Sequence, residues 1–426
     1  MNNSNPWVAP FLVSSSDSLI RSRALLLPEP IVGLEKLDPT QATFLIQKTL
    51  DVCFVPTENA VAVMRTILDL SIAQALQRFV SVDAYISKIS SPTFSISPGP
   101  IYCLTGLAGV GKSSLLAAVR RLVTTQGSVQ IPGHGSHPLV PYGIVELTSS
   151  WGEKEIVRQL GHTAYGAVNV ERFLYGRGYT SVVIDETQFL APGAQSHARI
   201  AKQIYLISRW GVLLIFSCNF SLVHKLEKRP HEERDRILSN PLVLTPDAPD
   251  SASWLSVLDA WQNILGRYLS FKLSNHAGEF WSLTGGLNRY GVRLLVIAYQ
   301  LSRARNNKKI DWSDILAAYE SMIFCRMRAE VIALFTASMG GKQPGRDLVC
   351  SFKSVKDAEY WENLRSRGVR KASSAIAELS LNVKQKAALK EYRKPDPSVT
   401  TKRTPSVRRT VESLTIAAHR FEKSKK

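Results

Sequence analysis

Three short uninterrupted apolar runs in this 426-residue chain predict buried strands. The runs are Ile101–Thr105, Ser181–Ile184 and Gly211–Ser217, and each is followed within two residues by a glycine or a polar side chain. Uninterrupted apolar runs of this length are typical of parallel strands that helices cover on both faces. The stretch Ser114–Val119, just after the first run, has the spacing of a helix. The pattern therefore predicts an α/β fold around a parallel sheet.

Helical spacing dominates on both sides of these strands. Residues 57–90 predict an amphipathic helix that packs on the core or on a partner, through Val61, Met64, Ile67, Leu68, Ile72, Leu76 and Phe79. Residues 250–325 are also helical in pattern, with a capped helix start at Ile310–Leu316. Gln126–Pro141 is rich in glycine, histidine and proline, which predicts a loop. Residues 1–55 are interrupted by prolines and show no clear pattern.

The turn from the first predicted strand into its helix has the phosphate-binding P-loop pattern, GxxxxGK[ST], at residues 106–113. Its glycines let backbone N–H groups converge on phosphates, and the helix N-terminus adds the positive end of its dipole. Lys112 is expected to bridge the β- and γ-phosphates of a nucleoside triphosphate, and the Ser113 hydroxyl to ligate Mg²⁺. The predicted nucleotide-binding residues are Gly106, Leu107, Ala108, Gly109, Val110, Gly111, Lys112, Ser113 and Ser114.

Polar residues that follow the other two strands predict the hydrolytic part of the same site. Asp185 is placed to hold Mg²⁺ through water, and Glu186 to polarise the attacking water as general base. The two acids could instead cap a following helix or be solvated. Asn219 follows the third strand, where it could hydrogen-bond the water or the γ-phosphate, and is equally well interpreted as a turn residue.

Composition bears on the cellular compartment of the protein and on metal binding. Five cysteines are dispersed without CxxC spacing, which indicates a reducing compartment and no metal framework. The eight histidines show no zinc pattern. Neither a run of about 18 apolar residues nor a basic signal segment is present, so the expectation is a cytoplasmic protein.

The positive charge is concentrated at the C-terminus. Residues 341–426 carry 21 Lys and Arg against nine Asp and Glu, which is +12 of the formal net charge of +18. This composition predicts a flexible basic tail, with a helix around Ala372 to Tyr392. Such a tail can neutralise DNA phosphates with little sequence preference. The alternatives are a solubilising tail or an arm that docks a protein.

In this order of parts the chain resembles an AAA+ ATPase, and more closely the TnsC/TniB family of ATPases that regulate DNA transposition. The resemblance covers roughly residues 95–325. Beyond the P-loop it is carried by Ile144–Ser149 with Glu155–Gly161, by Val182–Gln188 and by Thr284–Leu295. One departure is Ser217-Cys218-Asn219, where the family commonly ends the strand with Gly-Thr-Pro.

The resemblance implies roles for several charged residues. Arg236 is implied as the arginine finger that completes a neighbouring subunit's site, with Arg234 in reserve. Arg289 and Arg293 compete for the nucleotide-sensing position of the lid, because at spacing i, i+4 they share one helix face. Lys154 and Arg158 are weak candidates for contact with DNA.

The implied fold is an AAA+ α/β core at residues 93–245 with an α-helical lid at 246–340, an N-terminal extension at 1–92 and the basic tail at 341–426. The implied function uses ATP and Mg as cofactors. ATP-bound subunits form a ring or helical filament on double-stranded DNA and recruit a transposase, with an endonuclease or target-selector subunit as a further partner, and hydrolysis disassembles them. The alternative is a replication-initiator or helicase-loader type AAA+ ATPase. A signalling ATPase with protein partners alone is disfavoured by the positive charge.

Overall fold

The structure is a computed structural model that describes residues 5–123, 127–146, 153–161, 169–187, 196–342, 344–352 and 354–380. Predictions for Thr148, Ser149 and Gln188, for the Lys154 side chain and for the tail beyond residue 380 lie outside these residues. Contacts along the chain define one compact unit, Met1–Arg365, and a second unit, Ser366–Lys426. The predicted helix at Ala372–Tyr392 is described only to Ser380, as the end of a helix that begins earlier, α16 (Val355–Ser380).

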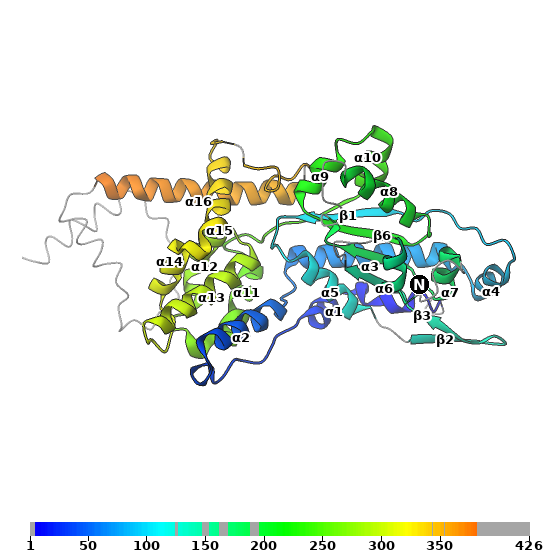
Figure 1. The fold of residues 1–426 in the computed structure, drawn as a ribbon, viewed down its shortest axis with the longest axis horizontal. Coiled ribbons are helices and arrows are strands. Elements are labelled where there is room, and N and C mark those ends of the chain that lie inside the picture. The colour runs from blue at the N-terminus through cyan, green and yellow to red at the C-terminus, as the bar shows by residue number, and fades with distance from the viewer. Residues whose placement is uncertain are drawn as a thin grey trace, which may run out of the picture. The chain divides into compact units, whose positions relative to one another are not determined.

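Five parallel strands form the central sheet, in the order β4-β5-β6-β1-β7 (Figure 1). Their bounds are β1 (Ile101–Gly106), β4 (Tyr142–Glu146), β5 (Ser181–Asp185), β6 (Leu213–Cys218) and β7 (Pro241–Leu244). The three predicted strands are confirmed as β1, β5 and β6, and every residue of β5 and β6 is buried. Because neighbouring strands are parallel, their carboxyl ends lie at one edge of the sheet, which brings the P-loop beside the residues after β5 and β6.

Helices cover both faces of the sheet, as uninterrupted apolar strands require. One buried cluster joins the sheet to α1 (Asp17–Ala24), α3 (Glu58–Arg78), α5 (Lys112–Leu122) and the lid. The other joins it to α6 (Glu153–Gln159), α7 (Val170–Gly176), α8 (Ser196–Ser208), α9 (Phe220–Leu226) and α10 (His231–Leu238). The predicted α/β class is therefore confirmed.

The amphipathic stretch at 57–90 is two helices, α3 and α4 (Val82–Ser90), with a break at Phe79–Ser81. Met64, Ile67 and Leu68 are fully buried against the core, as predicted, but Leu76 is half exposed. The unpatterned residues 1–55 form α1, a further helix α2 (Pro39–Val52) and two short 3-10 turns, η1 (Ala9–Ser15) and η2 (Leu34–Lys36).

The predicted loop at Gln126–Pro141 is wrong, because most of it forms an antiparallel hairpin of β2 (Gly127–Ile131) and β3 (Gly135–Leu139). Gly133 and Gly135 adopt φ of 77° and 78° at the reversal, a conformation that glycine reaches without a steric cost. Ile131 and Leu139 are buried in an aromatic cluster. This packing stabilises β2 and β3, although their glycine and proline content is typical of a loop.

The lid is helical, which confirms the prediction for residues 250–325. It consists of α11 (Ala252–Leu265), α12 (Ala277–Thr284), α13 (Asn288–Ala304), α14 (Trp312–Glu320) and α15 (Cys325–Ser338), with short 3-10 turns η4 (Gly266–Tyr268), η5 (Leu273–His276) and η6 (Met322–Phe324). The predicted helix start at Ile310–Leu316 is the beginning of α14. Asp311 and Asp314 form a reciprocal capping box there.

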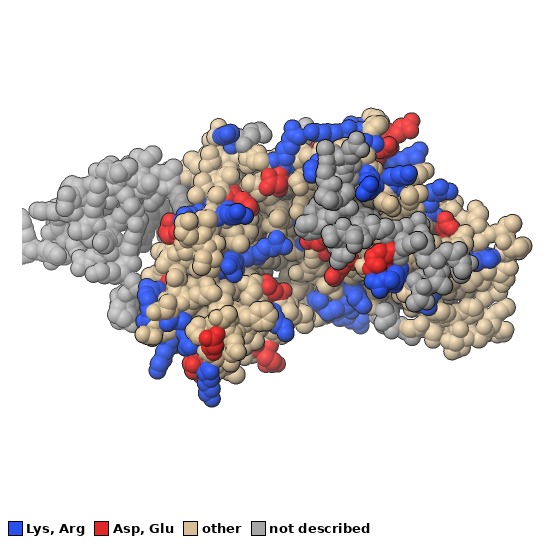
Figure 2. Space-filling model, viewed as in Figure 1, with Lys and Arg blue, Asp and Glu red and all other residues tan. Residues whose placement is uncertain are grey.

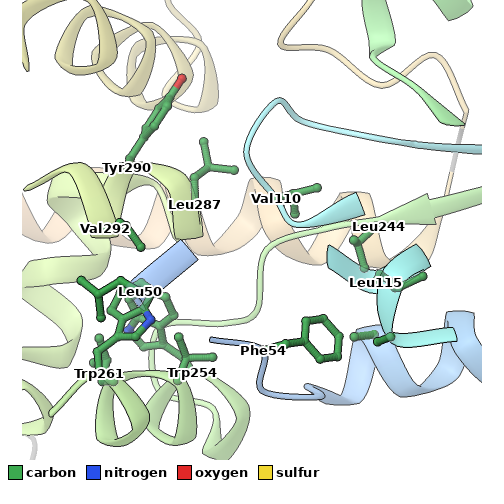
Figure 3. Close-up of a cluster of buried hydrophobic side chains, with 14 of the residues drawn as sticks. Leu50, Phe54, Val110, Leu115, Leu244, Trp254, Trp261, Leu287, Tyr290 and Val292 are labelled. Carbon is green, nitrogen blue, oxygen red and sulfur yellow. The ribbon is translucent and has the colours of Figure 1, made fainter. Parts of the chain in front are cut away.

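The end of α2 packs between the core and the lid. Figure 3 shows Leu50 beside Trp254 and Trp261 of α11, while Phe54 points towards Leu115 of α5. Leu50 is fully buried and Phe54 nearly so, and both belong to the cluster that is continuous from sheet to lid. This N-terminal segment therefore joins the two parts that flank the P-loop.

Candidate functional site

The P-loop runs from the end of β1 to the first turn of α5, and its glycines are required by geometry. Gly109 and Gly111 have φ of 82° and 107°, in the left-handed region. A Cβ added to Gly109 would lie 2.7 Å from the Cβ of Arg289. Side chains at these positions would therefore be strained, and at Gly109 would also collide with the lid.

Lys112 is held inside this loop by three acceptors. Its Nζ donates to the carbonyl oxygens of Gly106 at 2.9 Å and Leu107 at 3.2 Å, and to Oδ1 of Asn219 at 3.1 Å. The residue is only 8% exposed, and this burial lowers the pKa of Lys112. The nearby carboxylates of Glu186 and Asp185 act in the opposite direction and favour its charged form. The ammonium group therefore lies where the loop would receive phosphates.

Asn219 follows β6 and occupies the N-cap position of α9, but its side chain makes no capping hydrogen bond. Instead its oxygen accepts from Lys112. Of the two interpretations of Asn219, turn residue and site residue, this contact favours the second. Its catalytic role stays a prediction.

The two acids at the end of β5 differ in position. Asp185 is buried, and its Oδ1 accepts from the backbone N–H of Glu186 at 2.8 Å. Glu186 has a φ of 56°, which is rare for a residue with a Cβ and costs roughly 1–3 kcal/mol. The hydroxyl of the next residue, Thr187, donates to the carbonyl of Ser217, which links the segment after β5 to β6. The surrounding structure thus holds Glu186 in a strained conformation at the carboxyl edge of the sheet.

These residues surround a cavity of about 520 Å³, which we call the P-loop cavity. Residues 108–114 of the loop line it, together with Glu186, Asn219 and, from the lid, Asn288 and Arg289. The volume is in the usual range for small-molecule sites. The structure therefore brings together predicted residues from three strand ends and the lid.

The cavity also has a wall that the sequence did not predict. Leu50, Phe54, Val55 and Thr57 line it from the N-terminal extension, and Asp247 from the connection before α11. Burial raises the pKa of Asp247 to about 6, although a hydrogen bond with Thr57 opposes the shift. Residues 1–55 showed no periodicity, so no signal in the sequence pointed to this wall. Asn288 lies in the stretch Thr284–Leu295 that carries the family resemblance, but nothing in the sequence assigned it a role of its own.

The structure separates the two lid arginines. Arg289 lines the P-loop cavity, and its backbone N–H donates to the carbonyl of Gly109 at 3.3 Å. Arg293, one turn later on α13, lines a different hollow between α13 and α2. The geometry therefore places Arg289, and not Arg293, at the P-loop cavity, and its role in sensing nucleotide stays a prediction.

Neither finger candidate lies among the described residues that line the cavity of its own chain. Arg234 pairs with Asp235 at 3.1 Å. Arg236 is exposed on α10, with its guanidinium carbon 5.5 Å from the ring centre of Tyr205 on α8. An exposed arginine away from its own site fits action on a neighbour. The weak DNA candidate Arg158 is already paired with Glu155, at 2.6 Å and 2.8 Å.

The donors near the P-loop fit a magnesium ion. Of the two predicted ligands, the Ser113 hydroxyl lines the cavity, whereas the Asp185 carboxylate is buried behind it, near enough to favour the charged form of Lys112. A hydroxyl and a carboxylate are hard oxygen donors of the kind that suits Mg²⁺. Elsewhere, within the described ranges, no group of three or more His, Cys, Asp or Glu side chains could hold a metal ion. No helix in the described part of the chain is long and apolar enough to cross a membrane.

No known protein-family model matches the chain. Among solved structures it is similar to the ORC2 protein of Aeropyrum pernix with ADPNP and ADP, at 14% identity and a TM-score of 0.38, over 69% of this chain and 84% of that one. It is also similar to Cdc6p of Pyrobaculum aerophilum, at 13% identity and a TM-score of 0.36, over 70% of this chain and 86% of that one. A third similar structure is the ORC1 protein of A. pernix in complex with DNA, at 16% identity and a TM-score of 0.37, over 72% of this chain and 82% of that one. These likenesses concern the fold alone. The fold itself is a five-stranded parallel α/β sheet in the order β4-β5-β6-β1-β7, with the P-loop after β1 and a helical lid after β7.

Proposed function

We propose that this chain is an AAA+ ATPase that acts as a molecular switch, binding and hydrolysing ATP in the P-loop cavity. The observation that carries the proposal is the convergence of Lys112, Glu186, Asn219 and Arg289 on one cavity from four separate parts of the chain. A glycine-rich turn without a ligand would not require a buried lysine, or a glutamate with a strained backbone, beside it. Titration with a fluorescent ATP analogue, followed by phosphate-release measurements, tests it.

Each group has a distinct task in this mechanism. Backbone N–H groups of the loop and Lys112 hold the phosphates, so Lys112 exchanges its present carbonyl acceptors for phosphate oxygens. Ser113 and Asp185 would hold Mg²⁺, which when bound neutralises charge on the β- and γ-phosphates. Glu186 accepts a proton from the attacking water, and the Asn219 amide orients that water or the γ-phosphate. Arg289 senses the nucleotide from the lid of the same chain.

Arg236 would complete the site of an adjacent subunit. Its charge is available because no carboxylate of the described chain is paired with it, in contrast to Arg234. A guanidinium from a neighbour stabilises charge that develops on the γ-phosphate in the transition state. Assembly and hydrolysis are then coupled, because the ATP state stabilises subunit contacts and cleavage removes that stabilisation.

Arg236→Ala is expected to leave ATP binding by isolated subunits intact and to lower hydrolysis by about 10³–10⁵-fold, the effect of losing an arginine finger. Mixing Arg236→Ala with Lys112→Ala subunits should restore part of the activity, since some interfaces then combine an intact P-loop with an intact finger. Phosphate release by the mixture is the measurement. If both variants fold and assemble but the mixture stays inactive, the finger is Arg234 or another residue.

Arg289→Ala is expected to weaken binding of an ATP analogue by about tenfold or more, because a charge-assisted hydrogen bond contributes about 1.5–3 kcal/mol. Arg293→Ala is the matched control, since it removes the same group one turn away, outside the cavity. Equilibrium titration of both variants checks this. A larger loss for Arg293→Ala would reverse the assignment.

We propose DNA as the surface on which the switch works. The formal charge of +18 supports contact with phosphates, and Figure 2 shows basic side chains spread over one face of the molecule with acidic ones between them. The motif resemblance favours a transposition regulator with a transposase as partner. The similar ORC and Cdc6 structures, at 13–16% identity, fit the alternative of a replication initiator or helicase loader better.

One experiment separates these two classes. Negative-stain images of the protein with an ATP analogue and duplex DNA of arbitrary sequence should show rings or filaments if it regulates transposition. Binding confined to origin sequences or to a replicative helicase would support the second class. ATP-dependent co-purification with a candidate transposase serves as the second readout.

A further inference from the structure

A second hollow, of about 530 Å³, lies between α2 and α13, outside the P-loop cavity. We call it the α2–α13 groove. From α2 it is lined by Pro39, Thr40, Thr43, Phe44 and Gln47, and from α13 by Arg293, Val296, Gln300, Arg303 and Ala304. Nothing in the proposed ATPase cycle uses this groove, although the same two helices also contribute residues to the P-loop cavity.

The chemistry of the lining is one-sided. It holds two arginines and three further side chains with N–H or O–H groups for a ligand, Thr40, Gln47 and Gln300. The Thr43 hydroxyl already donates to the carbonyl of Pro39, and none of the ten residues is acidic. A groove with this set of donors presents positive potential to a ligand, so charge complementarity calls for an anion.

Phe44 is the unusual member of the lining. It is 69% exposed, although α2 has buried positions available at Ala42, Ile46 and Leu50. A large aromatic side chain left in solvent beside two arginines offers a flat face to a ligand. Aromatic faces interleaved with cations are the usual composition of surfaces that bind single-stranded nucleic acid.

The walls are held in place by contacts of their own. Arg303 donates from Nη2 to the carbonyl of Leu37 at 3.4 Å, which uses one of its five N–H groups. Gln47 donates to Asp51 at 2.8 Å. Ile46 of α2 and Ile297 of α13 are fully buried in one hydrophobic cluster. The groove is therefore formed before any ligand arrives.

We propose that the α2–α13 groove binds a short stretch of single-stranded DNA, with a base stacked on Phe44 and the phosphates contacted by Arg293 and Arg303. Bases within a duplex are stacked on one another and offer no face to Phe44, which favours a single strand. An acidic peptide would satisfy the arginines but would leave the aromatic face without a planar partner. The choice of DNA over RNA rests on the proposed function, in which DNA is the surface on which the switch works.

The test uses the full chain without nucleotide, so that it succeeds or fails independently of ATPase activity. The probe is fluorescein-labelled dT20, and its anisotropy is measured against protein concentration at several salt concentrations. Phe44→Ala should weaken binding by roughly 5- to 150-fold, the effect of losing one stacked base. Phe44→Leu keeps an apolar side chain without the aromatic face and should be similarly weak. Arg303→Gln should lower the slope of log affinity against log salt by about 0.7.

Arg326→Gln is the charge-matched control, because Arg326 is exposed on α15 of the same lid but lies outside the groove. It should leave both the affinity and the slope unchanged. A dT20 probe that carries 5-iodouracil should cross-link to the peptide containing Phe44, as identified by mass spectrometry.

Three results would overturn the proposal. One is equal dT20 affinity for wild type, Phe44→Ala and Phe44→Leu, together with cross-links elsewhere in the chain. Another is stronger binding of rU20 than of dT20 that depends on Phe44. The third is binding of a deca-glutamate peptide, lost in Phe44→Ala and Arg303→Gln, without binding of dT20, which would assign the groove to an acidic protein partner.

Discussion

Lys112→Ala is expected to abolish nucleotide binding at ordinary concentrations, lowering affinity for ATP by about 10²–10⁴-fold. The estimate takes two charge-assisted hydrogen bonds to phosphate, at about 1.5–3 kcal/mol each. The ammonium is already positioned for this role, because its three present acceptors are two carbonyls of the loop itself and Asn219. Equilibrium titration with a fluorescent ATP analogue measures the loss.

Lys308→Ala is a suitable control for that experiment, since Lys308 is exposed on the connection between α13 and α14. It removes the same charge from the chain without touching the cavity. Thermal unfolding of both variants should show that each remains folded. A folded Lys112→Ala protein that binds ATP as tightly as Lys308→Ala would show that the P-loop does not bind the phosphates of ATP.

Glu186→Gln is expected to keep ATP and to lose hydrolysis by about 10²–10⁴-fold, the usual contribution of general base catalysis. The substitution preserves the size of the side chain. It also preserves the backbone N–H that donates to Asp185, and it leaves the strain at φ 56° unchanged because both residues carry a Cβ. The change in rate therefore isolates the proton-accepting group.

Single-turnover phosphate release, with bound ATP quantified in parallel, checks this prediction. Asp185→Asn provides the contrast, because loss of a magnesium ligand should weaken binding of Mg·ATP as well as slow the reaction. Wild-type turnover by Glu186→Gln would show that another group activates the water.

The sequence predicted the parts of the fold that depend on local pattern. The runs that begin at Ile101, Ser181 and Gly211 make up most of β1, β5 and β6. These strands are covered on both faces, a condition that leaves an uninterrupted apolar run in the sequence. The P-loop followed from its residue spacing and from its position between a predicted strand and a predicted helix. The capped helix start at Ile310–Leu316 was also predictable from local sequence, and Asp311 and Asp314 form its capping box.

What the sequence did not show depends on contacts between distant segments. Arg289 and Arg293 are equivalent in any single-helix view, and only the packing of α13 against the P-loop and α2 distinguishes them. Leu50 and Phe54 lack a clear local pattern, and their place between core and lid is set by tertiary packing. The hairpin at Gly127–Leu139 was missed because its glycines and prolines resemble those of a loop, while Ile131 and Leu139 are buried by distant aromatic residues.

Phosphate release per chain, measured against protein concentration, tests the central proposal most directly. If the P-loop cavity hydrolyses ATP and a neighbour supplies Arg236, the rate per chain should be low in dilute solution and rise steeply as subunits assemble. The same curve for Arg236→Ala should stay flat. A rate per chain that is constant at all concentrations and unaffected by Arg236→Ala, or the absence of any phosphate release by assembled wild-type protein, would contradict the account.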